Sequence, residues 1–96
     1  MAGRLRVRVQ ITLKLFAMFS EYLPRDPDGR QRAGHQVSVE VGDGTAVQDV
    51  IERFKLPKEQ VHLVLVNGRF VAPEDRPRHV LQPGDALAIW PMVAGG

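Results

Sequence analysis

Residues 36–54, QVSVEVGDGTAVQDVIERF, change from one hydrophobic period to another within a single stretch. The valines at positions 37, 39 and 41 alternate with polar residues, which is typical of a strand with one buried face. Apolar residues then recur at the spacing i, i+3, i+4 and i+7 of an amphipathic helix, and they are Val47, Val50, Ile51 and Phe54. The stretch therefore predicts a strand that leads through a turn into one helix.

The boundaries of this helix are predicted from its flanking residues. Gly42-Asp43-Gly44-Thr45 is typical of a turn that feeds a helix, and Thr45 is a suitable N-cap. Gln48, three residues later, would complete a capping box with Thr45. Pro57 is expected to end the helix, because the residue before a proline is disfavoured in helical conformation.

Upstream, a longer alternating stretch runs from Leu5 to Leu15 and is most regular over Val9–Phe16. Its odd positions are apolar and its even positions are polar, which predicts a second half-buried strand that pairs with the first as a hairpin. Phe19–Leu23 is consistent with a single helical turn. Residues 24–34, PRDPDGRQRAG, are rich in proline, glycine and charge, so we expect a mobile loop there.

Downstream of the helix, short apolar runs alternate with turn signals. The expected elements are a strand over Val61–Val66, an Asn67-Gly68 hairpin turn, a short strand over Arg69–Val71, an irregular segment over 72–79, a turn at Pro83-Gly84-Asp85 and a last strand over Ala86–Trp90. The order is strand, strand, helix and then three strands. It predicts an α+β fold of the β-grasp or ubiquitin-like kind, with a mixed sheet of four to five strands and one main helix on one face. We expect a single domain over residues 1–96 with a flexible C-terminal tail over residues 91–96.

Composition excludes several classes of function. The chain has 96 residues, a formal net charge of +2 and no cysteine, so thiolate catalysis, disulfides and Cys-based zinc sites are excluded. His35, His62 and His79 lack metal-ligand spacing, so no metal site is expected. No apolar run is long enough to span a membrane, and the N-terminus lacks the apolar core of a secretory signal. We therefore expect a cytoplasmic protein without a membrane partner.

The sequence closes on Pro91-Met92-Val93-Ala94-Gly95-Gly96. A terminal carboxylate is ionised at neutral pH, and two glycines without Cβ atoms leave its acyl carbon unhindered and able to enter a narrow channel. Such a carboxylate can attack a nucleotide phosphate, form an acyl-adenylate and pass to a sulfur or nitrogen nucleophile. The alternative interpretation is a frayed chain end without chemistry.

The chain resembles the MoaD/ThiS family of ubiquitin-like sulfur carriers over nearly its full length. The segments that carry the resemblance are Leu15-Phe16-Ala17, Gly44-Thr45-Ala46-Val47, Val66-Asn67-Gly68, Pro83-Gly84-Asp85 and the terminal Val93-Ala94-Gly95-Gly96. The ending looks most like MoaD, the small subunit of molybdopterin synthase. Each motif is weak alone, whereas their order and the position of the terminal pair are specific in combination.

This resemblance implies a carrier that acts with partner enzymes and is not itself an enzyme. An E1-like adenylyltransferase of the MoeB or ThiF type would use ATP to activate Gly96, with Gly95 behind it, and no cofactor would stay bound to the carrier. Sulfur transfer would then give a Gly96 thiocarboxylate. The acceptor would be a molybdopterin precursor in the large subunit of molybdopterin synthase, or the nascent thiazole of thiamin in a ThiS-like carrier.

Family members bind both partners through an apolar patch on the face of the sheet without the helix. Phe16, Phe70 and Trp90 match these positions, and they also stand out of phase with the buried alternation. The resemblance assigns tail residues 91–94 to the same contacts: Pro91, Met92, Val93 and Ala94. The alternative is that the three aromatic side chains fold back and cover the rim of the core.

The sequence also departs from the family pattern. Pro91 is followed by Met92 instead of a second proline, Ser20-Glu21 stand where an arginine is common, and the loop over 24–34 is long. Two further functions stay open: a ubiquitin-like modifier joined through Gly96 to a lysine amine, and a β-grasp module without acyl chemistry. The only support for the latter as an RNA-binding module is a basic strand face, formed by Arg4, Arg6, Arg8 and Lys14.

Overall fold

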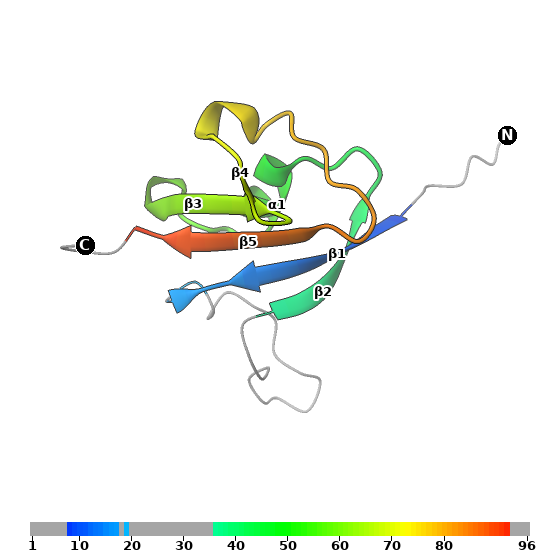
Figure 1. Ribbon diagram of the computed structural model, residues 1–96, viewed down its shortest axis with the longest axis horizontal. Coiled ribbons are helices and arrows are strands. Elements are labelled where there is room, and N and C mark those ends of the chain that lie inside the picture. The colour runs from blue at the N-terminus through cyan, green and yellow to red at the C-terminus, as the bar shows by residue number, and fades with distance from the viewer. Residues whose placement is uncertain (1–7, 18, 20–35, 93–96) are drawn as a thin grey trace, which may run out of the picture.

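Five strands form one mixed sheet in the order β2-β1-β5-β3-β4 (Figure 1). The structure is a computed structural model that describes residues 8–17, 19 and 36–92. The strands are β1 (Arg8–Leu15), β2 (Gln36–Gly42), β3 (Val61–Val66), β4 (Arg69–Phe70) and β5 (Ala86–Pro91). The helix α1 (Val47–Arg53) lies between β2 and β3 in the chain, so the predicted α+β architecture is confirmed.

The last strand occupies the centre of the sheet. It runs parallel to β1, with Leu13 opposite Leu87 and Leu15 opposite Ile89. On its other side β5 is antiparallel to β3, and β1 is antiparallel to β2 as the predicted hairpin requires. Because β5 is held on both sides, the point where the chain leaves the sheet after Pro91 is fixed by two neighbouring strands.

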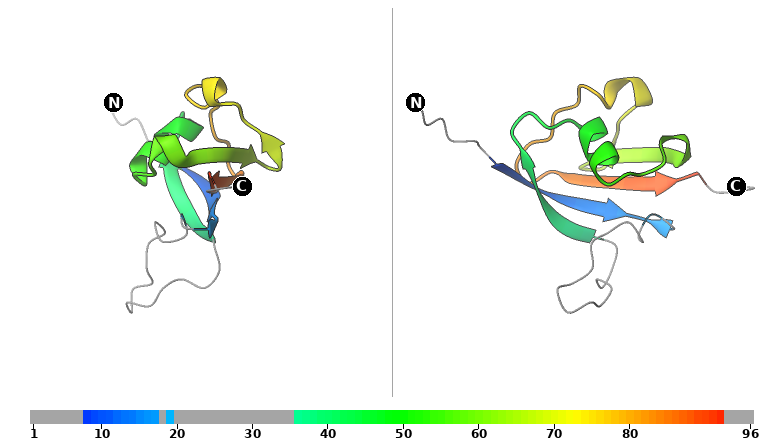
Figure 2. Two further views of the ribbon diagram at one scale, coloured as in Figure 1. Left: turned by 90° about the vertical axis from the view of Figure 1, so that its left-hand side faces the viewer. Right: turned by 180° about the vertical axis from the view of Figure 1, so that it is seen from behind.

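The helix α1 lies against one face of the sheet, as the two views in Figure 2 show. The hydrophobic core lies between the helix and this face. The odd-numbered apolar residues of β1 and β2 point into it, and Val47, Val50 and Ile51 from α1 pack against them with 0–1% of their surface exposed. Phe54 is partly buried against the same cluster. The apolar stripe predicted from the helical spacing is therefore the buried face of α1.

The helix begins one residue later than predicted. Its N-cap is Ala46, whose extended backbone (φ −95°, ψ 165°) forms an isolated bridge with Val80. The backbone N–H of Ala46 donates to Asp49 Oδ2 at 2.9 Å, which replaces the expected Thr45–Gln48 capping box. The reason lies in the neighbouring segment, because the Thr45 carbonyl accepts a hydrogen bond from the Leu81 N–H.

The helix ends at Arg53, before Pro57, which was expected to end it. Lys55 adopts a left-handed conformation (φ 59°), its N–H donates to the Glu52 carbonyl, and the Leu56 N–H donates to the Ile51 carbonyl. This is the Schellman arrangement, in which a left-handed residue satisfies the last carbonyls of a helix. Glycine is usual at this position, and here a lysine occupies it. The buried Leu56 side chain anchors the turn to the core.

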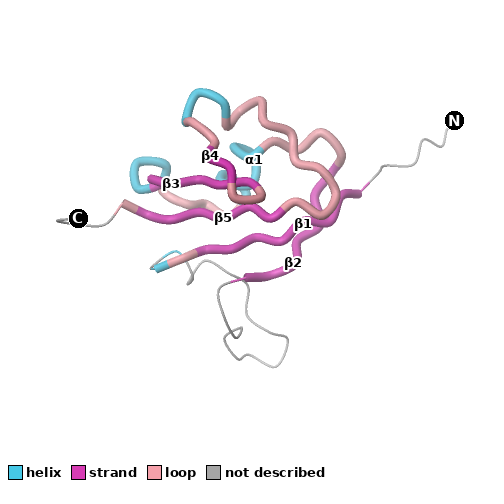
Figure 3. The backbone as a smooth tube through the Cα atoms, in the orientation of Figure 1, coloured by secondary structure: helices cyan, strands magenta, loops and turns pink. Residues whose placement is uncertain are grey.

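The β3–β4 connection is a tight hairpin turn. Asn67 (φ 53°) and Gly68 (φ 83°) both have positive φ, so the hairpin turn predicted from the Asn-Gly pair is of type I′. The strand after it is shorter than predicted, since β4 ends at Phe70, whereas β5 extends one residue further than predicted, to Pro91. Two short 3₁₀ turns, η2 (Lys58–Gln60) and η3 (Pro73–Asp75), appear as additional helical segments in Figure 3.

Two expected features fall largely outside the described residues. The loop over 24–34 is not described, and of the helical turn expected over residues 19–23 only Phe19 is described. Its side chain is fully buried in the core, and its N–H donates to the Phe16 carbonyl.

Candidate interaction surface at the base of the tail

Strand register places the three aromatic residues predicted for partner binding on the sheet face opposite α1. Phe16 continues the even-numbered positions of β1, Trp90 alternates with the buried Leu87 and Ile89 of β5, and Phe70 pairs with Leu65 across β3 and β4. Phe70 is 60% exposed, whereas Phe16 and Trp90 are half-buried. The three side chains therefore lie on one face, although they do not all touch.

Phe16 and Trp90 are in direct contact. Their ring centroids are 4.2 Å apart, and their planes differ by 2°. The Phe16 N–H donates to the Ile89 carbonyl, which extends the parallel β1–β5 pairing by one residue and aligns the two rings. The two rings lie on the sheet face opposite α1, where each covers part of the other. Partner binding by these residues stays a prediction.

Sequence reasoning missed the residues that join this stack to Phe70. Leu63 is the register partner of Trp90, and Leu65 is the partner of both Ala88 and Phe70. Val64 and Val66 belong to the core, so Leu63 and Leu65 point to the other face. We call the resulting surface the apolar patch, formed by Phe16, Leu63, Leu65, Phe70, Ala88 and Trp90. Its sequence signal was available, because β3 reads VHLVLV and is apolar on both faces.

The base of the tail adjoins this patch. Pro91 is buried at the end of β5 and pairs with Val61, and the Met92 N–H donates to the Gln60 carbonyl at 2.8 Å. The Met92 side chain is 57% exposed. The expected tail residues Val93, Ala94, Gly95 and Gly96 lie outside the described residues. The chain thus leaves the sheet after Pro91, next to the apolar patch.

The β1–β2 side of the same face is polar. Gln10 Nε2 donates to Ser38 Oγ at 2.9 Å, and Arg8 Nη1 lies 3.6 Å from Glu40 Oε1. Lys14 is the register partner of Ala88 and borders the apolar patch. Of the basic face considered for RNA, Arg4 and Arg6 lie outside the described residues, and Arg8 has a carboxylate neighbour. The described part of this face therefore offers little unpaired positive charge.

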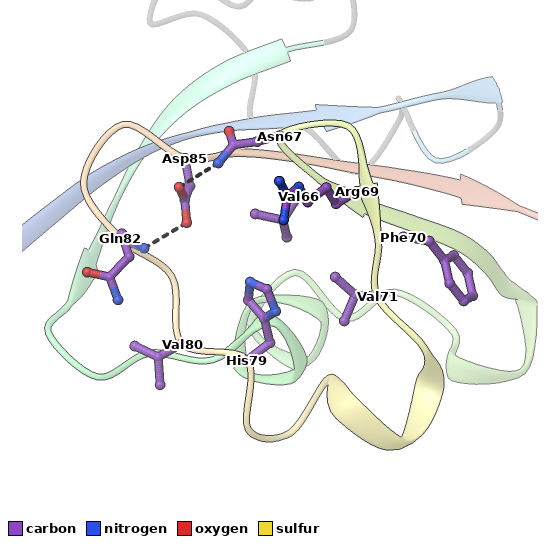
Figure 4. A pocket seen from close by; sticks show the side chains of 9 residues that line it. All are labelled: Val66, Asn67, Arg69, Phe70, Val71, His79, Val80, Gln82 and Asp85. Atoms are coloured by element: carbon purple, nitrogen blue, oxygen red, sulfur yellow. Dashed lines mark hydrogen bonds between the residues drawn. The ribbon is translucent and has the colours of Figure 1, made fainter.

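The opposite end of β5 carries an open groove with a volume of about 640 Å³ (Figure 4). The β3–β4 hairpin forms one side of it, and the segment over residues 79–85 forms the other. Asp85 holds the two sides together, because its carboxylate accepts from Asn67 Nδ2 and from the Gln82 N–H, each at 2.8 Å. Both oxygens of the Asp85 carboxylate, shown in Figure 4, therefore accept hydrogen bonds from the protein itself, which indicates a structural role for this side chain.

Among the described histidine, aspartate and glutamate side chains, no group is arranged to hold a metal ion. None of the described helices is both long and apolar enough to cross a bilayer.

The model of the ThiS family matches residues 29–96, which is more than half of the chain and includes the tail. The chain belongs to the ThiS family. This confirms the resemblance found from the sequence motifs. A comparison with curated protein sequences found no match.

Solved structures similar to this ThiS family member share its whole fold. The Haloferax volcanii HVO 2177 protein is 26% identical with a TM-score of 0.68, over 100% of this chain and 94% of that one. A candidate molybdopterin converting factor, subunit 1, from Pyrococcus furiosus is 26% identical with a TM-score of 0.59. The similarity covers 88% of this chain and 99% of that one. The small archaeal modifier protein 1 of Haloferax volcanii, at 23% identity, a TM-score of 0.59 and coverage of 88% and 99%, shows the fold alone.

Proposed function

We propose that this protein is a sulfur carrier of molybdopterin biosynthesis that works through its Gly96 carboxylate. The observation that carries the proposal is the ThiS family match, which continues through the tail to residue 96. The similarity to the molybdopterin converting factor subunit favours this pathway over thiazole synthesis. The protein supplies an acyl group, and partner enzymes supply the catalysis.

In this proposal an E1-like adenylyltransferase binds the apolar patch and ATP. A Gly96 carboxylate oxygen attacks the α-phosphorus of ATP and expels pyrophosphate, which leaves an acyl-adenylate. A sulfide equivalent from a sulfur donor then attacks the acyl carbon and displaces AMP, which leaves a thiocarboxylate. The thiocarboxylate sulfur then forms a bond to a molybdopterin precursor held in the large subunit of molybdopterin synthase, and water cleaves the acyl–sulfur bond and restores the Gly96 carboxylate.

The position of the patch supports this sequence of partners. Trp90 and the buried Pro91 are consecutive, so a protein seated on the Phe16–Trp90 stack also contacts the base of the tail. Because the Met92 N–H is bonded to Gln60, the direction in which the tail departs is set by the fold. A partner can therefore receive the tail without first ordering its base.

The test is the intact mass of the protein after incubation with an adenylating enzyme, ATP and a sulfur donor. We expect the mass change of one oxygen replaced by one sulfur, mapped to the peptide that contains Gly96. A variant extended by one residue beyond Gly96 is the matched control and should stay unchanged. If the extended variant donated sulfur without first losing its additional residue, the proposal would be wrong. An unchanged mass together with isopeptide-linked products would instead support a ubiquitin-like modifier.

A further inference from the structure

Arg76 is the one charged side chain that is buried among residues 8–17, 19 and 36–92, with 6% of its surface exposed. It follows the η3 turn, and its own carbonyl accepts from the Gln48 N–H at the start of α1. Arginine is rarely buried without a partner, because removing a cation from water is costly. The surroundings of its guanidinium therefore call for an explanation.

Among the described residues, hydrogen-bond acceptors lie along only one edge of the planar Arg76 guanidinium. Arg76 Nε donates to the Val71 carbonyl at 3.3 Å, and Nη2 donates to the His62 carbonyl at 3.4 Å. Nε and Nη2 lie on the same edge of the fork. Along the described chain, Nη1 has no hydrogen-bond acceptor, and no carboxylate lies within 4.0 Å of any guanidinium nitrogen. The edge formed by Nη1 and Nη2 is the geometry that binds an oxyanion with two parallel bonds.

Arg76 lines a cavity of about 180 Å³ between α1, η2 and η3. Lys58 and Gln48 bring further donors to its rim, and its remaining walls are apolar, formed by Ile51, Val61 and Pro73. A water molecule takes up roughly 30 Å³ of liquid, so the cavity has room for a phosphate-sized ion. It is smaller than the roughly 300–1,000 Å³ of sites for drug-sized ligands, which favours a small ion over a nucleotide.

The two donors at the rim, Lys58 and Gln48, both contact the Glu52 carboxylate. Lys58 Nζ lies 3.3 Å from Glu52 Oε2, and Gln48 Nε2 donates to the same oxygen at 3.4 Å. The Lys58 and Glu52 side chains are 65% and 52% exposed, so solvent screens this pair strongly. Burial lowers the pKa of Arg76, and the charge of Glu74 opposes this only in part. Among the described residues the buried guanidinium therefore has no ion-pair partner, and the Glu74 charge compensates its burial only in part.

We propose that this cavity binds a small oxyanion, held by the Nη1–Nη2 edge of Arg76 with Lys58 and Gln48 at the rim. Phosphate and carboxylate share the required chemistry, the first as a free ion and the second also as an acidic side chain of a partner. The site goes beyond the proposed carrier function and does not depend on it. It lies next to the base of the tail, because Lys58 and Gln60 belong to the same η2 turn and Gln60 holds Met92.

The test is an NMR titration of the ¹⁵N-labelled full chain with sodium phosphate, with sodium chloride keeping the ionic strength constant. We expect saturable shifts of the Arg76 Nε–H signal and of the Gln48, Lys58 and Met92 amides. A parallel titration with acetate separates the two sources: tighter acetate binding points to a partner carboxylate, and tighter phosphate binding to the free ion. Shifts that do not saturate, or that chloride alone reproduces, would overturn the site.

Three variants test whether the oxyanion binds in this cavity. Lys58→Gln removes a charged donor from an exposed rim position and should weaken binding roughly fivefold to tenfold. Arg78→Gln is the matched control, because Arg78 is an exposed arginine close in sequence that does not line the cavity, and it should leave binding unchanged. Arg76→Lys keeps the charge but removes the fork, and it should abolish saturation if the variant folds. Equal binding by the Lys58→Gln variant and the unmodified protein would contradict the proposal even if Arg76→Lys does not fold.

Discussion

Phe16 and Trp90 stack face to face across the parallel β1–β5 pair, with ring centroids 4.2 Å apart and an interplanar angle of 2°. The contact lies on the sheet face opposite the core, next to the strand end from which the tail departs. Each ring covers one face of the other and leaves the remaining surface to a partner. Mutations can separate the contribution of this stack to stability from the partner binding that we propose for the apolar patch.

The structural role of the stack predicts an energetic coupling. Aromatic pairs typically contribute about 0.5–1.5 kcal/mol beyond the area that they bury. In a double-mutant cycle with Phe16→Ala and Trp90→Ala, urea denaturation should give a coupling free energy of unfolding in this range. A coupling near zero would mean that the two rings contribute independently and that the stack does not stabilise the fold.

The proposed binding of partners to the apolar patch is best tested at Phe70, which is the most exposed of its three aromatic side chains at 60%. Phe70→Glu should change the free energy of unfolding by no more than about 0.5 kcal/mol and weaken the binding of the adenylating enzyme more than about tenfold. Val80→Glu is the matched control, because Val80 is 40% exposed and lines the same groove as Phe70 but lies outside the apolar patch. The measurement is calorimetric titration of each variant with the adenylating enzyme. Equal losses of affinity in the two variants would show a general effect of the added charge and contradict a specific role of the apolar patch.

Asn67 combines a turn conformation with two side-chain hydrogen bonds, and two substitutions distinguish these contributions. Its Nδ2 donates to Asp85 Oδ1 at 2.8 Å, and its Oδ1 accepts from the Ala86 N–H at 2.9 Å. Asn67→Gly keeps the positive φ but loses both bonds, and it should lower the free energy of unfolding by about 1–2 kcal/mol. Asn67→Ala also strains the turn and should cost about 1 kcal/mol more. Equal losses in urea denaturation would rule out a conformational contribution.

Lys55 predicts a stabilising change. A left-handed conformation costs a residue with a Cβ roughly 1–2 kcal/mol, and glycine avoids this cost while losing more freedom on folding. We expect Lys55→Gly to raise the free energy of unfolding by about 0.5–1 kcal/mol, measured by thermal and urea denaturation. Lys55→Ala serves as the control and should leave stability within about 0.5 kcal/mol, since alanine keeps the strain. A destabilised glycine variant would show that the lysine side chain itself stabilises the helix end.

Most of the fold followed from periodicity, because burial on one face imposes a repeat of two on strands and of 3.6 on the helix. This identified the core face of β1 and β2 and the buried stripe of α1. Periodicity failed where a long-range contact decides the local structure. Thr45 is a better N-cap than Ala46 by residue type, but its carbonyl is engaged by Leu81, which is distant in sequence.

The candidate site was predictable only in part for the same reason. Phe16 and Trp90 could be assigned to one face from alternation, but their contact depends on the parallel pairing of the first and last strands. Leu63 and Leu65 were missed because a strand that is apolar on both faces reads as an ordinary core strand. Arg76 gave no signal, since an arginine in an irregular segment is usually exposed.

The central position of β5 has a mechanical consequence. Because β1 and β5 are parallel neighbours, a pull on the chain beyond Pro91 against a restraint at the start of β1 loads their hydrogen bonds in shear, all at once. The antiparallel contact with β3 resists the same displacement on the other side. Forced unfolding depends on the rate of crossing such a barrier and not on equilibrium stability alone. A partner that draws the tail into a narrow channel can therefore apply tension to it while the domain stays folded.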